Sequence, residues 1–214
     1  MTLNVKGLRQ SNYKISSHRG QCGLQTGISQ FTEKRFVRAM YSLHETDLLG
    51  KILDYEVPLK ACQSAQHGDI DLLSLNESTL FIIEFKQHHS KESILKGMLQ
   101  AYTYTCLVQA MKGSFCWSFS LAGSVVLVPT ILTFDTGESG RQLNDLAKYP
   151  NTRALLCCLN RDMVGLGLGQ IRAYINTNDK ADLDKCLTAN PSGPGEYIVN
   201  FREGFVPQFR RVLP

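Results

Sequence analysis

Two segments with the pattern of β-strands, joined by a short turn, constrain the fold of this chain more than any other feature. The first is DIDLLSL (69–75), the second is TLFIIEFKQ (79–87), and Asn, Glu and Ser lie between them. Asn and Ser favour tight turns, so the two segments predict a β-hairpin. The interior of its second strand is apolar except for Glu84 and Lys86. Because an unpaired charge is costly to bury, these two residues need a structural or functional reason to be there.

Helical and extended patterns surround the hairpin. Apolar residues recur at helical spacing in residues 29–45 and 91–111, while residues 51–59 and 124–134 have the pattern of strands. We therefore expect helix, strand, strand, strand, helix and strand across residues 31–135. A hairpin is antiparallel, whereas a strand–helix–strand crossover is usually parallel. The order predicts an α/β fold with a mixed central sheet flanked by helices.

The rest of the chain is expected to extend this core. Residues 1–30 are polar and predict an N-terminal arm, and residues 136–214 predict a C-terminal extension of the same domain. Within that extension we expect a helix over residues 142–160, a strand over residues 169–176 and a late strand near the end. Pro129 predicts that its strand is bent or lies near an edge of the sheet.

Cysteine usage and hydropathy indicate the compartment. The seven cysteines are odd in number and include an adjacent pair, which suits reduced thiols better than a disulfide framework. No apolar run is long enough to span a membrane, and the first residues lack the apolar stretch of a secretory signal. We therefore expect a cytoplasmic protein without a membrane partner.

Charge is distributed unevenly along the chain, although the net charge is only +4. Residues 1–51 carry eight Lys or Arg against three Asp or Glu, whereas residues 52–90 carry two against six. One interpretation is a solvated surface on which the charges are distributed by chance. The alternative is an acidic metal site flanked by surfaces that hold a polyanion, and charge patterning leaves both interpretations open.

Side-chain alternation gathers the acidic residues of the hairpin. Asp69 and Asp71 share one face of the first strand, and Glu84 and Lys86 share one face of the second. Pairing across the hairpin brings Asp71 and Glu84 within reach of one ion. Carboxylates held that close raise each other's pKa, and a divalent cation with hard oxygen ligands relieves the repulsion.

Such a site suits metal-assisted hydrolysis of a phosphodiester. Mg²⁺ or Mn²⁺ lowers the pKa of a bound water and stabilises charge on a phosphate under attack. Lys86 is placed to hold the phosphate or to orient the attacking water. The structural alternative is a Glu–Lys pair on an edge strand, but the segment FIIEFK is too apolar for an exposed edge.

The run GDIDLL…LFIIEFK…QAYTY resembles the PD-(D/E)XK nuclease superfamily. The pattern of that superfamily is an acid on the second core strand, (D/E)-x-K on the third and then a helix, and it is matched here by Asp71, Glu84 and Lys86. Gln100 and Tyr104 on the following helix are similar to the Q-x-x-x-Y element of the RecB-type branches. A spacing of four places both on one helix face.

The resemblance covers residues 31–135 and implies a restriction-endonuclease-like core. It implies that Asp71 and Glu84 bind Mg²⁺ or Mn²⁺ together with the carbonyl of Phe85, and that Lys86 supports the attacking water and the phosphate. It also implies three supporting residues, which are Gln100, Tyr104 and an outer ligand on the first helix, for which Glu33 is the first candidate and Glu45 the second.

The implied function is a metal-dependent nuclease that acts on nucleic acid, with DNA the expected substrate, in defence, repair or mobile-element biology. A homodimer fits an enzyme that cuts both strands. Two alternatives remain. One is a catalytically silent module of the same fold that binds nucleic acid or protein, and the other is a metal-dependent phosphatase or nucleotide hydrolase.

Several other residues carry two interpretations each. We expect Asp69 and the histidines near the hairpin to face solvent, with metal or phosphate ligation as the alternative; these histidines are His67, His88 and His89. Glu56 is equally well a ligand or a solvent-facing residue. Trp117 and Phe119 are expected in a core or lid rather than in a base-stacking platform. The final segment, which is expected to dock on the fold rather than to bind nucleic acid, combines Phe205 and Phe209 with Arg202, Arg210 and Arg211.

Overall fold

The computed structural model of the chain describes residues 7–15, 33–61, 68–88, 90–178 and 207–213. Its helices are α1 (Glu33–Leu43), α2 (Ile94–Ala110), α3 (Lys112–Ser118), α4 (Glu138–Asn144), the short 3₁₀ helix η2 (Leu146–Lys148) and α5 (Pro150–Gly165). Its strands are β1 (Glu45–Thr46), β2 (Gly50–Pro58), β3 (Asp69–Asn76), β4 (Thr79–Lys86), β5 (Val126–Phe134), β6 (Arg172–Asn176) and β7 (Phe209–Leu213).

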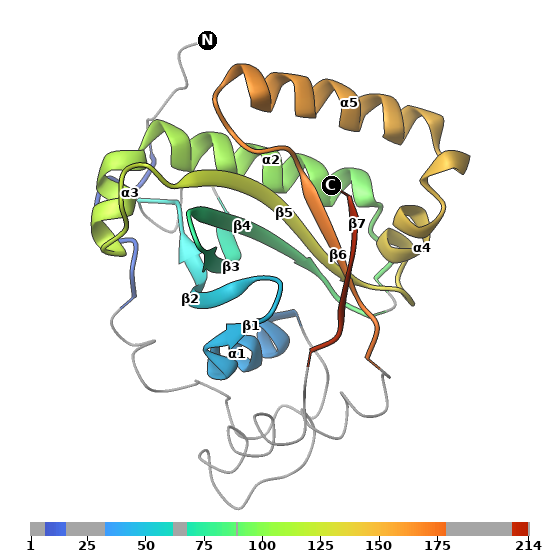
Figure 1. The fold of residues 1–214 in the computed structure, drawn as a ribbon, viewed down its shortest axis with the longest axis horizontal. Coiled ribbons are helices and arrows are strands. Elements are labelled where there is room, and N and C mark those ends of the chain that lie inside the picture. Colours follow the sequence, from blue (N-terminus) through green and yellow to red (C-terminus); the bar gives the residue numbers. More distant parts are fainter. Residues whose placement is uncertain (1–6, 16–32, 62–67, 89, 179–206, 214) are drawn as a thin grey trace, which may run out of the picture.

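The strands form one mixed sheet in the order of the chain, from β1 to β7 (Figure 1). Neighbours from β1 to β4 are antiparallel, β5 and β6 run parallel to β4, and β7 is antiparallel to β6. Each parallel step is made by a helical crossover, through α2 and α3 or through α4, η2 and α5. The predicted α/β class with a mixed sheet and flanking helices is confirmed. The short elements β1 and α3 were not predicted and interrupt the expected order.

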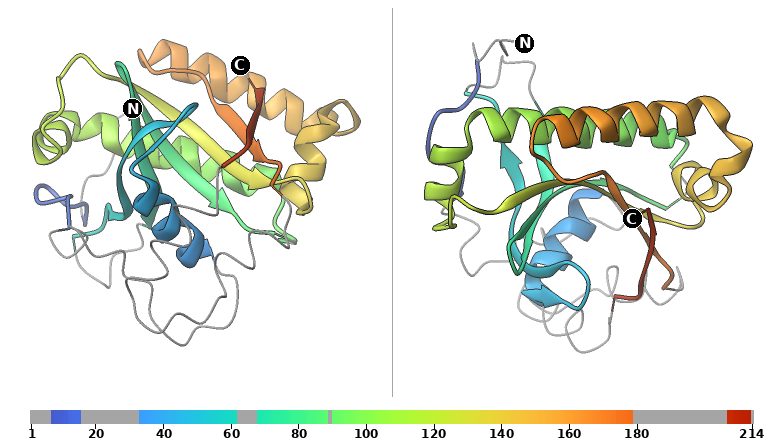
Figure 2. Two further views of the ribbon diagram at one scale, coloured as in Figure 1. Left: turned by 60° about the horizontal axis from the view of Figure 1, so that its bottom comes forward. Right: turned by 45° about the horizontal axis from the view of Figure 1, so that its top comes forward.

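Strand β4 separates two layers of core. Its odd-numbered residues 81–85 pack against α1, and the rings of Phe36 and Phe85 stack with centroids 4.6 Å apart. Leu80 and Ile82 lie in the core under α2. Figures 1 and 2 show α1 on one face of the sheet, with α2 and α5 on the other. Because the alternation continues along the strand, the two charged residues at the end of β4 fall on the α2 face.

Local chemistry explains where helices differ from expectation. The helix predicted over residues 142–160 is wrong, because this stretch is divided between α4, η2 and α5. Pro150 opens α5, where its fixed φ and missing N–H are tolerated. Helix α2 begins later than predicted, and its N-cap is Ser93, whose hydroxyl accepts a hydrogen bond from the Leu95 amide at 3.2 Å.

Pro129 lies within the sheet, between β4 and β6. It pairs with Ile82 of β4 but precedes Thr130, the first residue of β5 paired with β6. On the side of β6 this part of the strand is therefore locally an edge, which is where a residue without an amide N–H is tolerated.

The described part of the N-terminal arm is docked rather than free. Leu8 forms a β-bridge with Lys60, and the Arg9 amide donates to the Leu59 carbonyl at 2.9 Å. Tyr13 is fully buried, and its ring contacts that of Phe115 with centroids 5.0 Å apart. The rest of the expected arm lies outside the described residues. In the part of the chain that the structure describes, no helix combines the length and apolarity needed to cross a membrane.

The stacked pair between α1 and β4 predicts a large stability effect. We expect Phe36→Ala to lower the free energy of unfolding by about 3–5 kcal/mol, because it leaves a cavity against Phe85 in a fully buried layer. Leu48→Ala is the matched control, since Leu48 is 40% exposed and its truncation removes little packing. Urea unfolding followed by circular dichroism measures both, and equal losses for the two variants would contradict this account of the core.

Candidate functional site

The end of β4 holds a buried ion pair. Glu84 is 4% exposed and Lys86 is 3% exposed, and Lys86 Nζ lies 2.8 Å from Glu84 Oε1. The two side chains are neighbours because residues two apart on a strand share a face. Their mutual contact compensates part of the cost of removing both charges from water. The sequence-based expectation that neither residue lies on an exposed edge therefore agrees with the structure.

Sheet register brings Asp71 to the same place. The β3–β4 ladder ends at the pair Leu72↔Ile83, so the next position outward on each strand is Asp71 and Glu84. There Asp71 Oδ2 accepts a hydrogen bond from the Phe85 amide at 2.8 Å. The carboxylate thus replaces the strand partner that this amide would otherwise have, and it is held beside Glu84.

Burial and like charge perturb both carboxyl groups. Burial, followed by the negative charge of Glu84, raises the pKa of Asp71 to about 8, although the hydrogen bond from Phe85 partly opposes this. Burial also raises the pKa of Glu84, with Lys86 opposing the rise. For Lys86 burial favours the neutral amine, but the charge and hydrogen bond of Glu84 prevail and raise its pKa. Without a cation, Asp71 therefore retains a proton at neutral pH.

Helix α2 contributes the two residues expected from it. Gln100 Oε1 accepts a hydrogen bond from Lys86 Nζ at 3.2 Å, and a second hydrogen bond joins Gln100 to Tyr104. Burial raises the pKa of the Tyr104 phenol, so it stays protonated near neutral pH. A side chain at Gly68 would put its Cβ 2.1 Å from the Tyr104 hydroxyl, so the glycine leaves room for the tyrosine beside the start of β3.

Sequence reasoning missed Glu92, which also binds the lysine. Glu92 Oε2 lies 2.8 Å from Lys86 Nζ, and Glu92 forms a second ion pair with Lys96. Glu92 lies just before Ser93, the N-cap of α2, and so outside the helix, where no periodic pattern in the sequence indicates its position. Lys86 is thereby held by three oxygen-bearing side chains.

The first helix contributes one further acid. Glu33 Oε1 accepts from the Gln87 amide at 3.4 Å, and the charge of Glu33 helps to raise the pKa of Asp71 and of Glu84. The structure therefore brings Glu33 to the site. Glu45 is exposed in β1, beyond the opposite end of an 11-residue helix, about 16 Å long, so the structure does not bring it there.

Glu56 faces α1 rather than solvent or the site. Its carboxylate lies 2.8 Å from Lys34 Nζ and 2.7 Å from Arg38 Nη2. These partners lower its pKa despite its burial. Neither interpretation drawn from the sequence holds, because a positive φ of 44° at Glu56 disturbs the alternation of β2.

The remaining acid and histidine near the hairpin also have partners. Asp69 forms a long ion pair with Lys60 at 3.4 Å, with both side chains about one-third exposed. The expected solvent exposure of His88 is wrong, since its ring is 7% exposed and stacks on Phe134 at 3.6 Å between centroids. Its Nδ1 lies 2.8 Å from the Thr136 hydroxyl. His67 and His89 lie outside the described residues.

Two aromatic predictions have opposite outcomes. Phe119 is buried in the core as expected, whereas Trp117 is 78% exposed on α3, so its assignment to a core is wrong.

The final segment is docked, because Phe209–Leu213 forms β7 and pairs with β6. Arg210 and Arg211 are exposed on this strand, while Arg202 and Phe205 lie outside the described residues.

The donor atoms at the site suit a hard divalent cation. Among the described residues, no three His, Cys, Asp or Glu side chains converge as a metal cluster. The oxygen donors that the structure brings together here are the carboxylates of Asp71 and Glu84. Mg²⁺ commonly takes one or two protein carboxylates and completes its shell with water and substrate phosphate. Burial is the main cause of both raised carboxyl pKa values, and the like charge that adds to it is the repulsion such a cation relieves.

Comparison of the chain with protein-family models, with curated proteins and with solved structures finds no match.

The raised pKa of Asp71 predicts a pH-dependent stability. Its pKa rises from 3.8 to about 8, so the folded state binds this proton more tightly than the unfolded state. The resulting stability is present below about pH 4 and is lost as the pH rises through about 8. We expect the melting temperature in EDTA to fall between about pH 5 and pH 9, and to fall less for Asp71→Asn, whose side chain cannot ionise.

Thermal melts across this pH range test the prediction. Asp47→Asn is the control, because Asp47 is exposed and its substitution should leave the profile of the parent protein unchanged. Parallel profiles for the parent protein and Asp71→Asn would show that Asp71 does not carry the pH dependence.

Proposed function

We propose that this protein is a metal-dependent nuclease of the PD-(D/E)XK type that hydrolyses phosphodiester bonds in DNA. The observation that carries the proposal is the buried Glu84–Lys86 pair at the end of β4, with the proton-retaining Asp71 next to it. A sheet covered by α1 on one face and α2 on the other supports a restriction-endonuclease-like core. Gln100 and Tyr104 reach the same site from α2.

Asp71, Glu84 and the carbonyl of Phe85 would hold Mg²⁺ or Mn²⁺. The bound cation would supply an acidified water and a positive charge that stabilises the phosphate under attack. Asp71 would hold the ion as a carboxylate, and Glu84 would share its carboxylate between the ion and Lys86. The Lys86 ammonium would orient the nucleophile and contact the phosphate.

The other residues position Lys86 and the edge of the site. Gln100 fixes the ammonium through its Oε1 atom, and Tyr104 is tied to Gln100 one helical turn later. Glu92, from the segment between β4 and α2, also contacts the ammonium. Glu33, at the start of α1, lies at the edge of the site. Glu33 is thus suited to an outer role through water rather than to direct ligation.

A cleavage panel tests the proposal. Linear duplex, supercoiled plasmid, single strand, flap, four-way junction and RNA are incubated with Mg²⁺, Mn²⁺ or EDTA. We expect metal-dependent cutting that Lys86→Ala and Glu84→Gln reduce by about 10²–10⁴-fold, because the first removes the cation beside the phosphate and the second removes a charged metal ligand. Lys148→Ala is the matched control, since this lysine is 76% exposed on η2. Full activity of Lys86→Ala, with a normal circular dichroism spectrum, would refute the nuclease assignment.

A catalytically silent binding module is the second candidate. It is favoured by one observation, which is that Lys86 already contacts Glu84, Glu92 and Gln100, so the network is satisfied as a structural ion pair. Such a network has no requirement for a cation.

Metal titration separates the two candidates. At pH 7 we expect calorimetry to show Mg²⁺ or Mn²⁺ binding at up to millimolar concentration, with release of roughly one proton per ion because Asp71 must ionise. Repeating the titration in buffers of different ionisation enthalpy measures that proton, and Asp71→Asn should release less than half as much. Absence of binding at millimolar metal would favour the binding module.

A further inference from the structure

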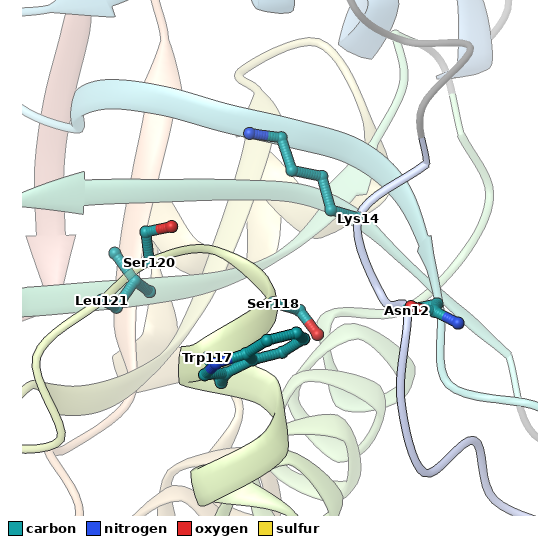
Figure 3. Close-up of a pocket in the computed structure, with 6 residues that line it drawn as sticks. All are labelled: Asn12, Lys14, Trp117, Ser118, Ser120 and Leu121. Atoms are coloured by element: carbon teal, nitrogen blue, oxygen red, sulfur yellow. The ribbon is translucent and has the colours of Figure 1, made fainter.

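A surface pocket of about 500 Å³ lies between α3 and the docked N-terminal segment. It is lined by Asn12, Lys14, Trp117, Ser118, Ser120 and Leu121. In Figure 3 Trp117 and Ser118 belong to one wall, while Asn12 and Lys14 come from the chain segment on the other. Its volume is within the range of roughly 300–1,000 Å³ that is usual for small-molecule sites.

The indole of Trp117 is exposed without an evident structural reason. It is 78% exposed, whereas its neighbours on α3, Phe115 and Cys116, are buried in the core. Its exposed ring, within the pocket, offers a flat aromatic face on which a base can stack.

The wall opposite the indole is held in place by the core. Tyr13, between Asn12 and Lys14, is fully buried, and its hydroxyl lies within hydrogen-bonding distance of the Arg9 carbonyl and 3.1 Å from the sulfur of Met111. Asn12 and Lys14 are both exposed. The burial of one residue thus presents the two flanking polar side chains across from the indole.

The charge around the pocket selects the ligand. No Asp or Glu lines it. The carboxylate of Asp54 lies behind the wall opposite the indole, where it is buried and accepts from the Ile15 amide at 3.4 Å. The basic residues nearest in sequence to the pocket walls are Arg9, Lys14 and Lys112. An anionic ligand is therefore favoured over a cationic one.

A pocket on α5 provides a contrast. It has a volume of about 410 Å³ and is lined by Cys158, Arg161, Asp162, Gly165 and Leu166. It contains a carboxylate and no aromatic ring, so it lacks both features that distinguish the pocket at Trp117.

We infer that the pocket at Trp117 binds one nucleotide of a single-stranded segment of the substrate, with the base stacked on the indole and a phosphate beside Lys14. Aromatic stacking combined with a backbone-neutralising cation is the usual chemistry of sequence-tolerant single-strand binding. Ser120 and Asn12 add polar groups at the rim. The inference rests on the proposed action on nucleic acid and adds to it a preference for substrates with an unpaired strand.

The position of the pocket fits one continuous strand. Trp117 follows Gln100, which contacts Lys86, by 17 residues through α2 and α3, or about 26 Å at the helical rise per residue. About eight nucleotides at the rise of B-form DNA cover that length. A flap or single-stranded tail of this size therefore reaches the pocket while its junction lies at Lys86.

Trp117 is the only tryptophan of the chain, so its fluorescence reports on this pocket alone. In EDTA, where no cleavage occurs, we expect a 12-nucleotide oligothymidylate to quench the emission and an abasic strand of the same length to quench it far less. A 12-nucleotide oligouridylate shows whether the pocket also takes RNA, and quenching by either polymer supports the inference. Equal quenching by the abasic strand would reduce the pocket to a polyanion contact and overturn it.

Variants measured by fluorescence anisotropy of a labelled oligonucleotide complete the test. We expect Trp117→Ala to weaken binding roughly tenfold to a hundredfold and Trp117→Phe to weaken it less. Lys14→Ala should make the negative slope of log affinity against log salt concentration shallower by about 0.7. Lys148→Ala should leave this slope unchanged. Unchanged affinity of Trp117→Ala would overturn the inference.

These measurements fail independently of the nuclease proposal. A protein that cuts in a Lys86-dependent manner but whose Trp117 variants bind normally would keep the nuclease and lose the pocket. A protein that never cuts but shows base-dependent quenching would keep the pocket and lose the nuclease.

Discussion

Burial of a glutamate and a lysine on an interior strand is the constraint on which the rest of this structure depends. Strand β4 has β3 on one side and β5 on the other, with α1 and α2 over its faces, so Glu84 and Lys86 are only 4% and 3% exposed. An apolar pair of similar volume would often be as stable or more stable at such a place. The ion pair is therefore poorly explained by stability alone. It is better explained by chemistry that needs a charge to be held at a fixed position.

Ordinary rules of sheets and helices then deliver the remaining groups. Alternation assigns the odd residues of β4 to the core beneath α1 and the even ones to α2. Register sets Asp71 beside Glu84, and the ladder ends there because the carboxylate of Asp71 captures the Phe85 amide. On α2, a spacing of four residues brings Gln100 and Tyr104 to one face, and Glu92 joins them from the segment just before the helix. The site is thus a consequence of regular geometry, and no strained loop among the described residues is needed to form it.

This regularity decides how much of the molecule the sequence could predict. The hairpin, both flanking helices and the grouping of Asp71 with Glu84 and Lys86 follow from local periodicity, which a single sequence records. The outcomes for His88 and Trp117 depend on contacts between distant segments, because Phe134 covers one ring and nothing comparable covers the other. The role of Tyr13 as an anchor likewise requires Phe115, a hundred residues away, and no local pattern indicates it.

The surroundings of the two ends of α2 differ in charge, so a polyanion would interact with them differently. Near the start of the helix, the acids Asp71, Glu84, Glu92 and Glu33 outnumber Lys86 and Lys96, so a phosphate would be repelled until a cation compensated the carboxylates. Beyond its end, Lys14 and Trp117 line a pocket without acids, where a nucleotide needs no metal. Under this proposal, binding of a nucleotide at Trp117 and cleavage at Lys86 are therefore separable. A strand anchored at Trp117 would approach Lys86 along α2, and only a metal-loaded site would accept it.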